Sequence, residues 1–267
     1  KLVIVKAGDV FSREKLNDST KAIGERLGKE GYAFANVNAA PEIDKEKRNV
    51  AFTIFVDPGK RVYVRRINVT GNTKTRDEVI RRELRQMEGG WYDADRVQAS
   101  KLRLDRLGFF NEVAIETPAV AGANDQVDVN YTVVERPSGS LMFGIGYGQE
   151  SGVMINASVT QNNFLGTGNQ LGLVLNNSGS GQNYSLTYND PYYTPDGISR
   201  GFKVYYREID TAQVNAADYY LNSYGVQVSY GFPLNEFDTL RLSPGYEHLW
   251  IGTNSGTPIE ILYDIEQ

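Results

Sequence analysis

The sequence predicts two folds in series: an α+β region built from β-α-α-β-β modules, then antiparallel strands of a transmembrane β-barrel. Three observations support this prediction. The density of charged residues changes near Pro137, pairs of motifs recur roughly 80 residues apart, and the second part alternates between apolar and small polar residues with a period of two.

The change in charge divides the chain into two parts. Residues 1–137 carry 24 Lys and Arg and 21 Asp and Glu, whereas residues 138–267 carry 4 and 12. Tyrosine changes in the opposite direction, from 4 residues to 13, and Lys203 is the only lysine of the second part. A water-soluble sheet usually keeps lysine on its edges to prevent aggregation. We therefore expect the two parts to lie in different solvents.

The composition also limits the chemistry. The 267 residues include no cysteine and one histidine, His248. Without cysteine neither a disulfide framework nor a thiolate metal site can form, and one histidine fits none of the usual zinc ligand sets. We interpret His248 as structural, and we expect no enzyme activity, no cofactor and no metal. No apolar run approaches the ~18–20 residues that a transmembrane helix needs.

The recurring motifs indicate a module that is present twice. Gly31–Tyr32 recurs as Gly108–Phe109, each after a helical pattern. In the second copy a strand pattern comes first, followed by a helix pattern that begins after Thr75 and ends at Gly89–Gly90. A second helix pattern and two alternating strand patterns complete the β-α-α-β-β order.

Three regions follow from these patterns. Residues 1–60 form a module without its first strand, which is missing or reduced to a stub at residues 2–5, so the chain is expected to begin inside a module. Residues 61–137 form a complete module, and residues 138–267 form the N-terminal part of a barrel with about seven strands. Bacterial single-chain barrels have an even number of strands, so we expect an incomplete barrel, with Pro244 interrupting the seventh strand.

The alternating segments of residues 138–267 carry apolar residues on one face and mainly Gly, Ser, Thr, Asn and Gln on the other. Strands of about ten residues with this pattern and with tyrosines near their ends are typical of an outer-membrane barrel. The alternative is a soluble β-sandwich, in which a second protein layer would cover the apolar face.

Motifs along the chain occur in the order found in a known family. They are Val64–Ile67, Gly71–Asn72, Arg81–Gly89, Arg106–Phe110, Asp125–Val129, Glu135–Arg136, Phe143–Gly148, Asn163–Gly168 and Asp190–Gly197. Together they resemble the BamA family of outer-membrane protein assembly factors over essentially the whole chain. The resemblance implies periplasmic POTRA modules, here the fourth, truncated, and the fifth, followed by a barrel in the bacterial outer membrane.

The resemblance also implies a function and partners. The family assists the folding and insertion of outer-membrane proteins, so the expected partners are unfolded client proteins, assembly-machinery lipoproteins and outer-membrane lipid, without nucleic acid. The lipoprotein contact of the fifth module carries over to Arg81, Arg85 and Glu88. Apart from the resemblance, these charges would be interpreted as a solvated helix face.

The first barrel strand forms one side of the family's seam, where clients are thought to template their strands. Glycine in a strand packs little and loses much entropy, so this strand is expected to pair weakly; the alternative is that the glycines only make room inside the barrel. Clients could also add strands to free edges of the module sheets by β-augmentation. The residues carried over to the seam are Leu141, Phe143, Gly144, Ile145, Gly146, Tyr147 and Gly148.

Other functions stay open from the sequence. A related transporter with POTRA modules and a barrel would secrete one dedicated partner protein. A passive porin would not need the charged repeat, and a soluble adhesin-like module would not need an apolar face exposed to lipid. An enzyme is the least favoured class.

Overall fold

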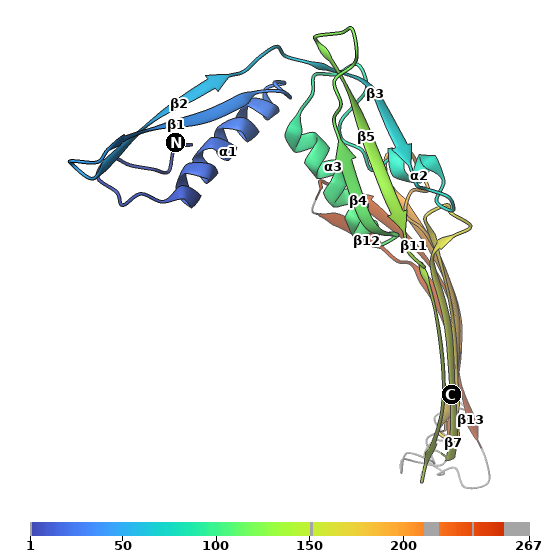
Figure 1. Cartoon of the computed structure of the whole chain (residues 1–267). Helices are drawn as coiled ribbons and strands as arrows, with labels where there is room; N and C mark the ends of the chain where they lie inside the picture. The colour runs from blue at the N-terminus through green and yellow to red at the C-terminus, as the bar shows by residue number, and fades with distance from the viewer. Residues whose placement is uncertain (1, 150–151, 211–218, 237, 254–267) are drawn as a thin grey trace. The chain divides into compact units, whose positions relative to one another are not determined.

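The computed structural model describes residues 2–149, 152–210, 219–236 and 238–253 (Figure 1). The chain divides into two compact units, one of Lys1–Thr73 with Ile80–Arg136 and one of Lys74–Val79 with Pro137–Gln267. Among the described residues, no helix has the length and apolar character needed to cross a membrane. Residues 254–267, which include the expected end of the barrel part, lie outside the described residues.

The first module consists of one helix and a two-stranded sheet. Helix α1 (Arg13–Lys29) begins where the Ser12 side chain accepts a hydrogen bond from the Lys15 backbone N–H, a normal N-cap. It packs against β1 (Asn36–Asp44), which pairs in antiparallel fashion with β2 (Asn49–Asp57) (Figure 1). Residues 2–5 form no strand, and no described residue of this module supplies a third one.

The second module has the predicted β-α-α-β-β order. It contains β3 (Tyr63–Thr70), α2 (Asp77–Arg81), α3 (Ala94–Leu107), β4 (Phe110–Glu116) and β5 (Gln126–Glu135). The sheet order is β3-β5-β4, with β3 parallel and β4 antiparallel to β5. The α+β fold class is therefore confirmed. The core side chains are fully buried and include Val64, Ile80, Leu104, Val127, Val129 and Tyr131.

The first helix of this module is much shorter than predicted. The sequence pattern predicts a helix up to Gly89, but α2 ends at Arg81 and residues 82–90 form turns and bends. After α2 the backbone closes tight turns instead, with the Glu83 N–H donating to the Ile80 carbonyl and the Leu84 N–H to the Arg81 carbonyl. Tertiary contacts of this segment with α3, described below, outweigh its helix propensity.

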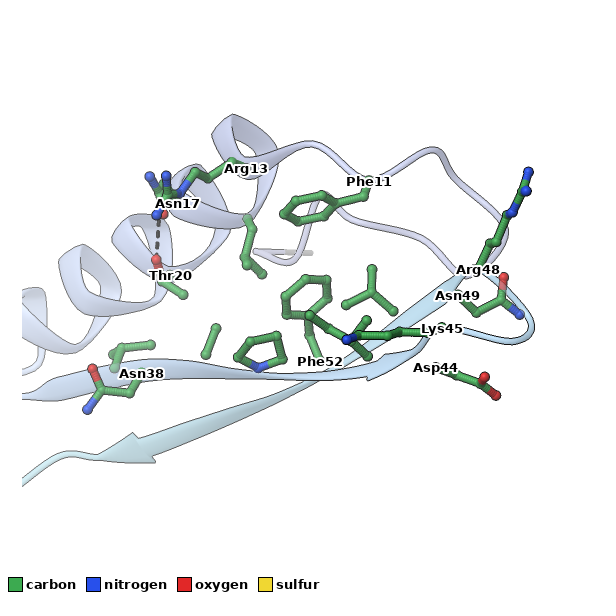
Figure 2. Close-up of a pocket in the computed structure, with 16 residues that line it drawn as sticks. Phe11, Arg13, Asn17, Thr20, Asn38, Asp44, Lys45, Arg48, Asn49 and Phe52 are labelled. Carbon is green, nitrogen blue, oxygen red and sulfur yellow. Dashed lines mark hydrogen bonds between the residues drawn. The ribbon is translucent and has the colours of Figure 1, made fainter.

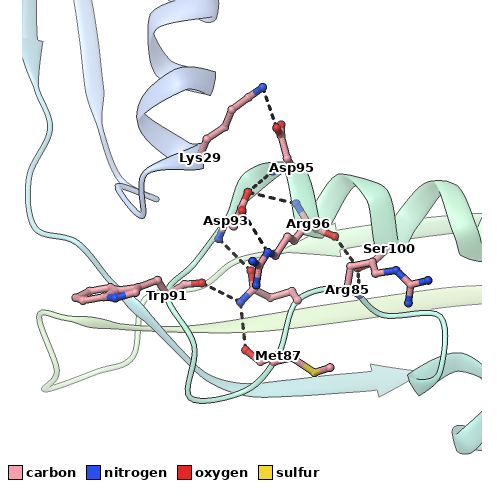
Figure 3. A network of polar contacts seen from close by, with 9 residues as sticks. Lys29, Arg85, Met87, Trp91, Asp93, Asp95, Arg96 and Ser100 are labelled. Carbon is pink, nitrogen blue, oxygen red and sulfur yellow. Dashed lines mark hydrogen bonds and ion pairs between the residues drawn. The ribbon is translucent and has the colours of Figure 1, made fainter. Parts of the chain in front are cut away.

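The two modules of this unit are joined by polar and aromatic contacts. The Arg61 guanidinium lies 4.6 Å from the ring centre of Trp91, and its Nε donates to the Glu30 carbonyl at 2.6 Å. Figure 3 shows the ion pair between Lys29 of α1 and Asp95 of α3, whose atoms are 2.8 Å apart. Because Val62 also donates its N–H to the Gly31 carbonyl, the connection between the modules is a short backbone contact rather than an extended linker.

The second unit is one antiparallel sheet in which successive strands are neighbours. Its order is β12-β11-β10-β9-β8-β7-β6, and β13 continues along β11 beyond β12. Pro244 stands between β12 and β13, so the last strand is interrupted there as the sequence predicts. The bounds are β6 (Gly139–Gly148), β7 (Gly152–Phe164), β8 (Asn169–Ser178), β9 (Gly181–Asp190), β10 (Ser199–Asp210), β11 (Tyr219–Pro233), β12 (Thr239–Leu242) and β13 (Gly245–Thr253).

The strand register gathers the apolar residues on one face of this sheet. Leu141, Val159 and Leu173 are consecutive partners across β6, β7 and β8, and the row continues across β9 and β10. Their side chains are 76%, 45% and 37% exposed, and no second protein layer covers the face in the described residues. This arrangement agrees with strands that face lipid and not with a sandwich.

Lys74–Val79 belongs to the same unit as the sheet and lies against the turn between β7 and β8. The Asn163 amide donates to the Thr75 hydroxyl at 2.8 Å, and the Arg76 N–H donates to the Gly166 carbonyl at 2.9 Å. Gly166 has a φ of 73°, and a Cβ there would collide with the Lys74 carbonyl. Only glycine adopts this positive φ readily and also leaves room for the Lys74 carbonyl.

Candidate functional site

Two of the three residues carried over for partner binding, Arg81 and Glu88, lie at the outer edge of β3. The Glu88 carboxylate accepts a hydrogen bond from the Ile67 backbone N–H at 2.7 Å, and Arg81 donates to the Ile67 carbonyl at 3.3 Å. The Arg81 and Glu88 side chains approach to 3.9 Å and are 45% and 48% exposed. These two side chains therefore satisfy backbone groups that an edge strand would otherwise leave open.

The same edge is covered by backbone on the other side of Ile67. Val64 donates its N–H to the Gly90 carbonyl at 2.9 Å and accepts from the Gly89 N–H at 2.7 Å, and Val62 accepts from the Tyr92 N–H. The edge of β3 is thus occupied from Val62 to Ile67. The other edge strand of this sheet is β4, so the free edge expected for the module can lie at β4 and not at this part of β3.

Arg85 lies apart from the other two predicted residues. Its backbone N–H donates to the Ser100 hydroxyl of α3 at 2.8 Å, and Ser100 in turn donates to the Arg96 carbonyl (Figure 3). The half-buried Arg85 is therefore held by α3, whereas Arg81 and Glu88 are held by β3.

Two buried polar residues between α2 and α3 were not singled out from the sequence. Gln86 is 1% exposed, and its amide donates to the carbonyls of Met87 and Trp91 and accepts from the Asp93 N–H. Glu83 is also buried and pairs with Arg103 of α3 at 2.7 Å. Both hold the turn segment that positions Glu88. The only sign of these two residues in the sequence is that each is a polar residue inside an otherwise regular helix pattern.

A second charged pair crosses the β3–β5 ladder. Arg65 lies at an irregularity in the β3 register and donates to the Asp128 carboxylate of β5 through Nε at 2.9 Å. The hydrogen bond from the guanidinium holds the pKa of Asp128 below its usual value and raises the pKa of Arg65. The pair stays ionised near neutral pH.

The seam residues form an edge strand in the structure. Strand β6 pairs with β7 alone in the described residues, so its other edge carries backbone N–H and C=O groups without a neighbouring strand. Its apolar side chains are among the most exposed of the sheet, with Leu141 and Tyr147 both at 76%. Phe143 and Ile145 lie between them on the same face and are 68% exposed.

Gly144, Gly146 and Gly148 of β6 lie on the opposite face, and Gly144 is loosely packed. A Cβ built on Gly144 would meet nothing within 4 Å, and one on Gly146 would meet only the end of the Met154 side chain, at 3.2 Å. By contrast, a Cβ on Gly225 of β11 would collide with the Tyr205 ring, at 2.5 Å. In the described residues, Gly144 is thus not required by crowding.

The first module contains a cavity of 960 Å³ between α1 and the β1–β2 hairpin (Figure 2). Phe11 and Phe52 stack at 5.2 Å beside it, and Leu16 of α1 also faces it. Arg48 and Asp44 lie at its hairpin end. The cavity reflects a helix that covers its sheet only in part.

His248 lies among aromatic rings on the sheet, with its ring centre 5.4 Å from Tyr224 and 5.7 Å from Trp250. In the part of the chain that the structure describes, no group of three or more His, Cys, Asp or Glu residues could hold a metal ion.

Comparison with known families supports the interpretation of both units. The POTRA family (surface antigen variable number repeat) matches residues 1–59 and 62–136, and the Omp85 superfamily domain matches residues 163–265. "Outer membrane protein assembly factor BamA" of Neisseria meningitidis serogroup B is 36% identical over 260 residues, which cover 97% of this chain and 33% of that protein. The chain belongs to the BamA family.

A second BamA relative, from Buchnera aphidicola subsp. Acyrthosiphon pisum, is 29% identical over 92% of this chain and 40% of its own length. The chain thus spans about a third of the length of these curated relatives. A solved structure of BamA from Haemophilus ducreyi lacking POTRA domains 1-3 has a TM-score of 0.80 and 39% identity over 94% of this chain and 48% of that one. As in other BamA proteins, the sheet belongs to the bacterial outer membrane and the POTRA modules lie in the periplasm.

CdiB from Acinetobacter baumannii shares the fold. Its structure covers 96% of this chain with a TM-score of 0.53 and 15% identity. This level of identity shows a common architecture and carries no functional argument beyond it.

Proposed function

We propose that this chain is part of a protein that assists the folding and insertion of β-barrel proteins into the bacterial outer membrane. The loose packing of β6, the first strand of the sheet, carries the proposal. A strand can pair with an incoming strand through backbone hydrogen bonds, which tolerate many client sequences. Pairing makes and breaks no covalent bond, so the proposed activity is not enzymatic.

Two properties of β6 suit it to transient pairing. Gly144, Gly146 and Gly148 fall on one face of the strand, and a Cβ at Gly144 would meet nothing within 4 Å. A client strand can therefore pair with β6 and leave again without breaking a packed side-chain interface on that face. In this proposal the residues of the seam are Leu141, Phe143, Gly144, Ile145, Gly146, Tyr147 and Gly148.

Disulfide cross-linking tests this proposal, because the 267 residues contain no cysteine of their own. We would place cysteine at Ser140 of β6 in the full-length protein and scan cysteines along the terminal strand of a client. Cross-links should form at Ser140 and not at the matched position Val174→Cys on β8, which has neighbours on both sides. Equal cross-linking at both positions would show that β6 is not the client edge.

Strand addition to the POTRA modules is a second part of the proposal. Because the outer edge of β3 is occupied, we assign strand addition in the second module to β4 and in the first module to the β1–β2 sheet. Cysteines at Asn111 of β4 and at Arg66 of β3, which lies within the occupied stretch, test the assignment. Only the Asn111→Cys variant should capture a client strand, and capture at Arg66→Cys would overturn it.

We further propose that Arg81, Arg85 and Glu88 contact a lipoprotein of the assembly machinery. Glu88 is half exposed, so a cation of a partner can reach its free carboxylate oxygen while Ile67 keeps the other. Glu88→Gln keeps an acceptor for Ile67 and removes the charge, whereas Glu88→Lys removes both. Pull-down of the lipoprotein should fall in both variants and stay unchanged in Asp105→Lys, a charge reversal on the exposed end of α3.

The two Glu88 variants separate two explanations. If only Glu88→Lys loses the lipoprotein, the contact depends on the geometry of the β3 edge and not on the charge. If neither variant loses it, the assignment of the partner site is wrong. Hydrogen exchange of the Ile67 amide measures independently whether its hydrogen bond at the β3 edge is kept. The exchange should accelerate in Glu88→Lys alone.

The alternative of a transporter for one dedicated partner protein has less support. The curated relatives are named as assembly factors, and the likeness to CdiB is one of fold. Reconstitution of the full-length protein with several unrelated client barrels separates the two, because a dedicated transporter would accept one of them.

A further inference from the structure

Arg200 is the one lysine or arginine on the apolar face of the sheet among its described residues. The register places it in a row with Asp190, Tyr230 and Leu242. The other described basic residues, which are Lys203, Arg207 and Arg241, fall in rows on the opposite face. A charge on the face that contacts lipid is costly unless it lies at the polar boundary or finds a partner.

The position of Arg200 is at the periplasmic end of the sheet. The chain passes from the second module into β6 at Pro137, and each later strand runs antiparallel to its neighbour. The end of β9 and the start of β10 therefore lie at the same end of the sheet as the start of β6. Arg200 is thus at the level where the apolar face ends and phospholipid headgroups begin.

Aromatic rings flank the guanidinium of Arg200, and one of its donors has no hydrogen-bond partner. Arg200 lies 3.6 Å from the ring centre of Tyr193 and 5.1 Å from that of Phe202. Its Nε is buried and has no hydrogen-bond partner. Asp190, its neighbour in the row, instead accepts a hydrogen bond from the Tyr192 N–H at 3.0 Å. A buried donor without a partner is unfavourable, so the site is built for an acceptor.

We propose that Arg200, positioned by Tyr193 and Phe202, binds the phosphate of a phospholipid headgroup in the periplasmic leaflet. A planar guanidinium offers parallel N–H donors that match two phosphate oxygens, and stacking on a ring leaves those in-plane donors available. The neighbouring apolar face, with Phe202 and Val204 exposed, provides a surface for the acyl chains of the same lipid.

Native mass spectrometry of the full-length protein in a phosphate-free detergent tests the proposal. The protein would be delipidated and mixed with dioleoylphosphatidylglycerol or with dioleoylglycerol, which has the same chains and no phosphate. Wild type should retain the phospholipid in preference to dioleoylglycerol. Arg200→Gln should lower phospholipid retention by about tenfold, as expected for the loss of a charge-assisted bidentate contact.

Arg207→Gln is the matched control, because Arg207 lies on the same strand and on the opposite face. Its retention of phospholipid should equal that of wild type, and Arg200→Lys should retain an intermediate amount. Tyr193→Leu, which removes the stacked ring and keeps the charge, should also weaken retention and remains informative if Arg200→Gln does not fold.

Three results would overturn the proposal. Retention by Arg200→Gln at the level of wild type would show that Arg200 does not bind the headgroup. Equal retention of dioleoylglycerol would show that only the acyl chains are recognised. Displacement of the phospholipid by an equal concentration of inorganic phosphate would show a free-anion site rather than a lipid site.

Discussion

The second POTRA module and the strand sheet contain the same apolar residue types in opposite surroundings. Val64 and Val129 of the module are completely buried, whereas Val159 and Val204 of the sheet are 45% and 51% exposed. In the module, two helices and three strands close around the apolar side chains, so water is excluded by protein. In the sheet no described layer covers them, so lipid must exclude the water.

The first module illustrates what closes such a core. It has a helix and two strands that correspond to α3, β4 and β5, yet all the buried apolar residues of its unit belong to the second module. Ile43 and Phe55, for example, are 67% and 60% exposed. The second module has a parallel strand, β3, and a helix segment, α2, that the described part of the first module does not have.

A charge in the module core should have the largest effect. Val129→Lys places an unpaired ammonium group among fully buried side chains and should destabilise the second module by about 4 kcal/mol or more. Urea denaturation of the full-length protein, followed by circular dichroism, measures the change. Val134→Lys is the control on the same strand, since Val134 is 48% exposed, and it should change stability by less than about 0.5 kcal/mol. Similar losses in both variants would contradict the burial difference.

The same substitution on the sheet should depend on the membrane. Val204→Lys puts a charge on the lipid-facing surface of β10 and should destabilise the inserted protein by about 2–4 kcal/mol in a bilayer, depending on depth. Gln227→Lys lies on the opposite face, in the row of Lys203, and should have little effect. Unfolding titrations in phospholipid vesicles compare the two. Equal destabilisation would place both faces in the same solvent.

A smaller effect is expected at the turn that contacts Lys74–Val79. Gly166→Ala combines a positive φ with a collision against the Lys74 carbonyl, so it should destabilise the protein by about 1–3 kcal/mol. Gly122→Ala also has a positive φ but open space around its Cβ, and it should cost about 1 kcal/mol. The difference in thermal stability between the two variants gives the cost of the collision, because both share the cost of a positive φ. A larger loss for Gly122→Ala would show that the turn relaxes.

The smallest effect concerns pH and the Arg65–Asp128 pair. Because the pKa of Asp128 is lower in the folded state, the unfolded state binds more protons as pH falls. The contribution of Asp128 to stability is complete above its unfolded pKa of about 3.9 and is lost as pH decreases through the folded value. Asp128→Asn should therefore have a shallower loss of stability below about pH 4, measured by urea midpoints. Parallel profiles for wild type and Asp128→Asn would contradict the assignment.

Local patterns predicted much of the fold. The period of two placed Leu141, Phe143, Ile145 and Tyr147 on one face, and their register confirms that face. The turn and helix signals also gave the β-α-α-β-β order of the second module. These signals were wrong after Arg81, where the helix pattern continues but the chain turns. There the buried side chains of Glu83 and Gln86 bind Arg103 and the Asp93 N–H, which lie outside the predicted helix.

The candidate sites were less accessible from the sequence. The resemblance pointed to Glu88, but nothing in the sequence indicates that its carboxylate binds the Ile67 N–H, 21 positions away. Tyr193 entered only as part of the Asp190–Gly197 motif, and Arg200 was not singled out, since a single arginine beside a turn has no distinctive spacing.

The sequence alone determined which residues are apolar, how they alternate and where the chain changes its solvent, because these properties depend on neighbours along the chain. Only the tertiary structure decided which sheet edges are open and which charges lack a partner. Those properties depend on hydrogen bonds between segments far apart in sequence, such as the cover of residues 88–92 over β3.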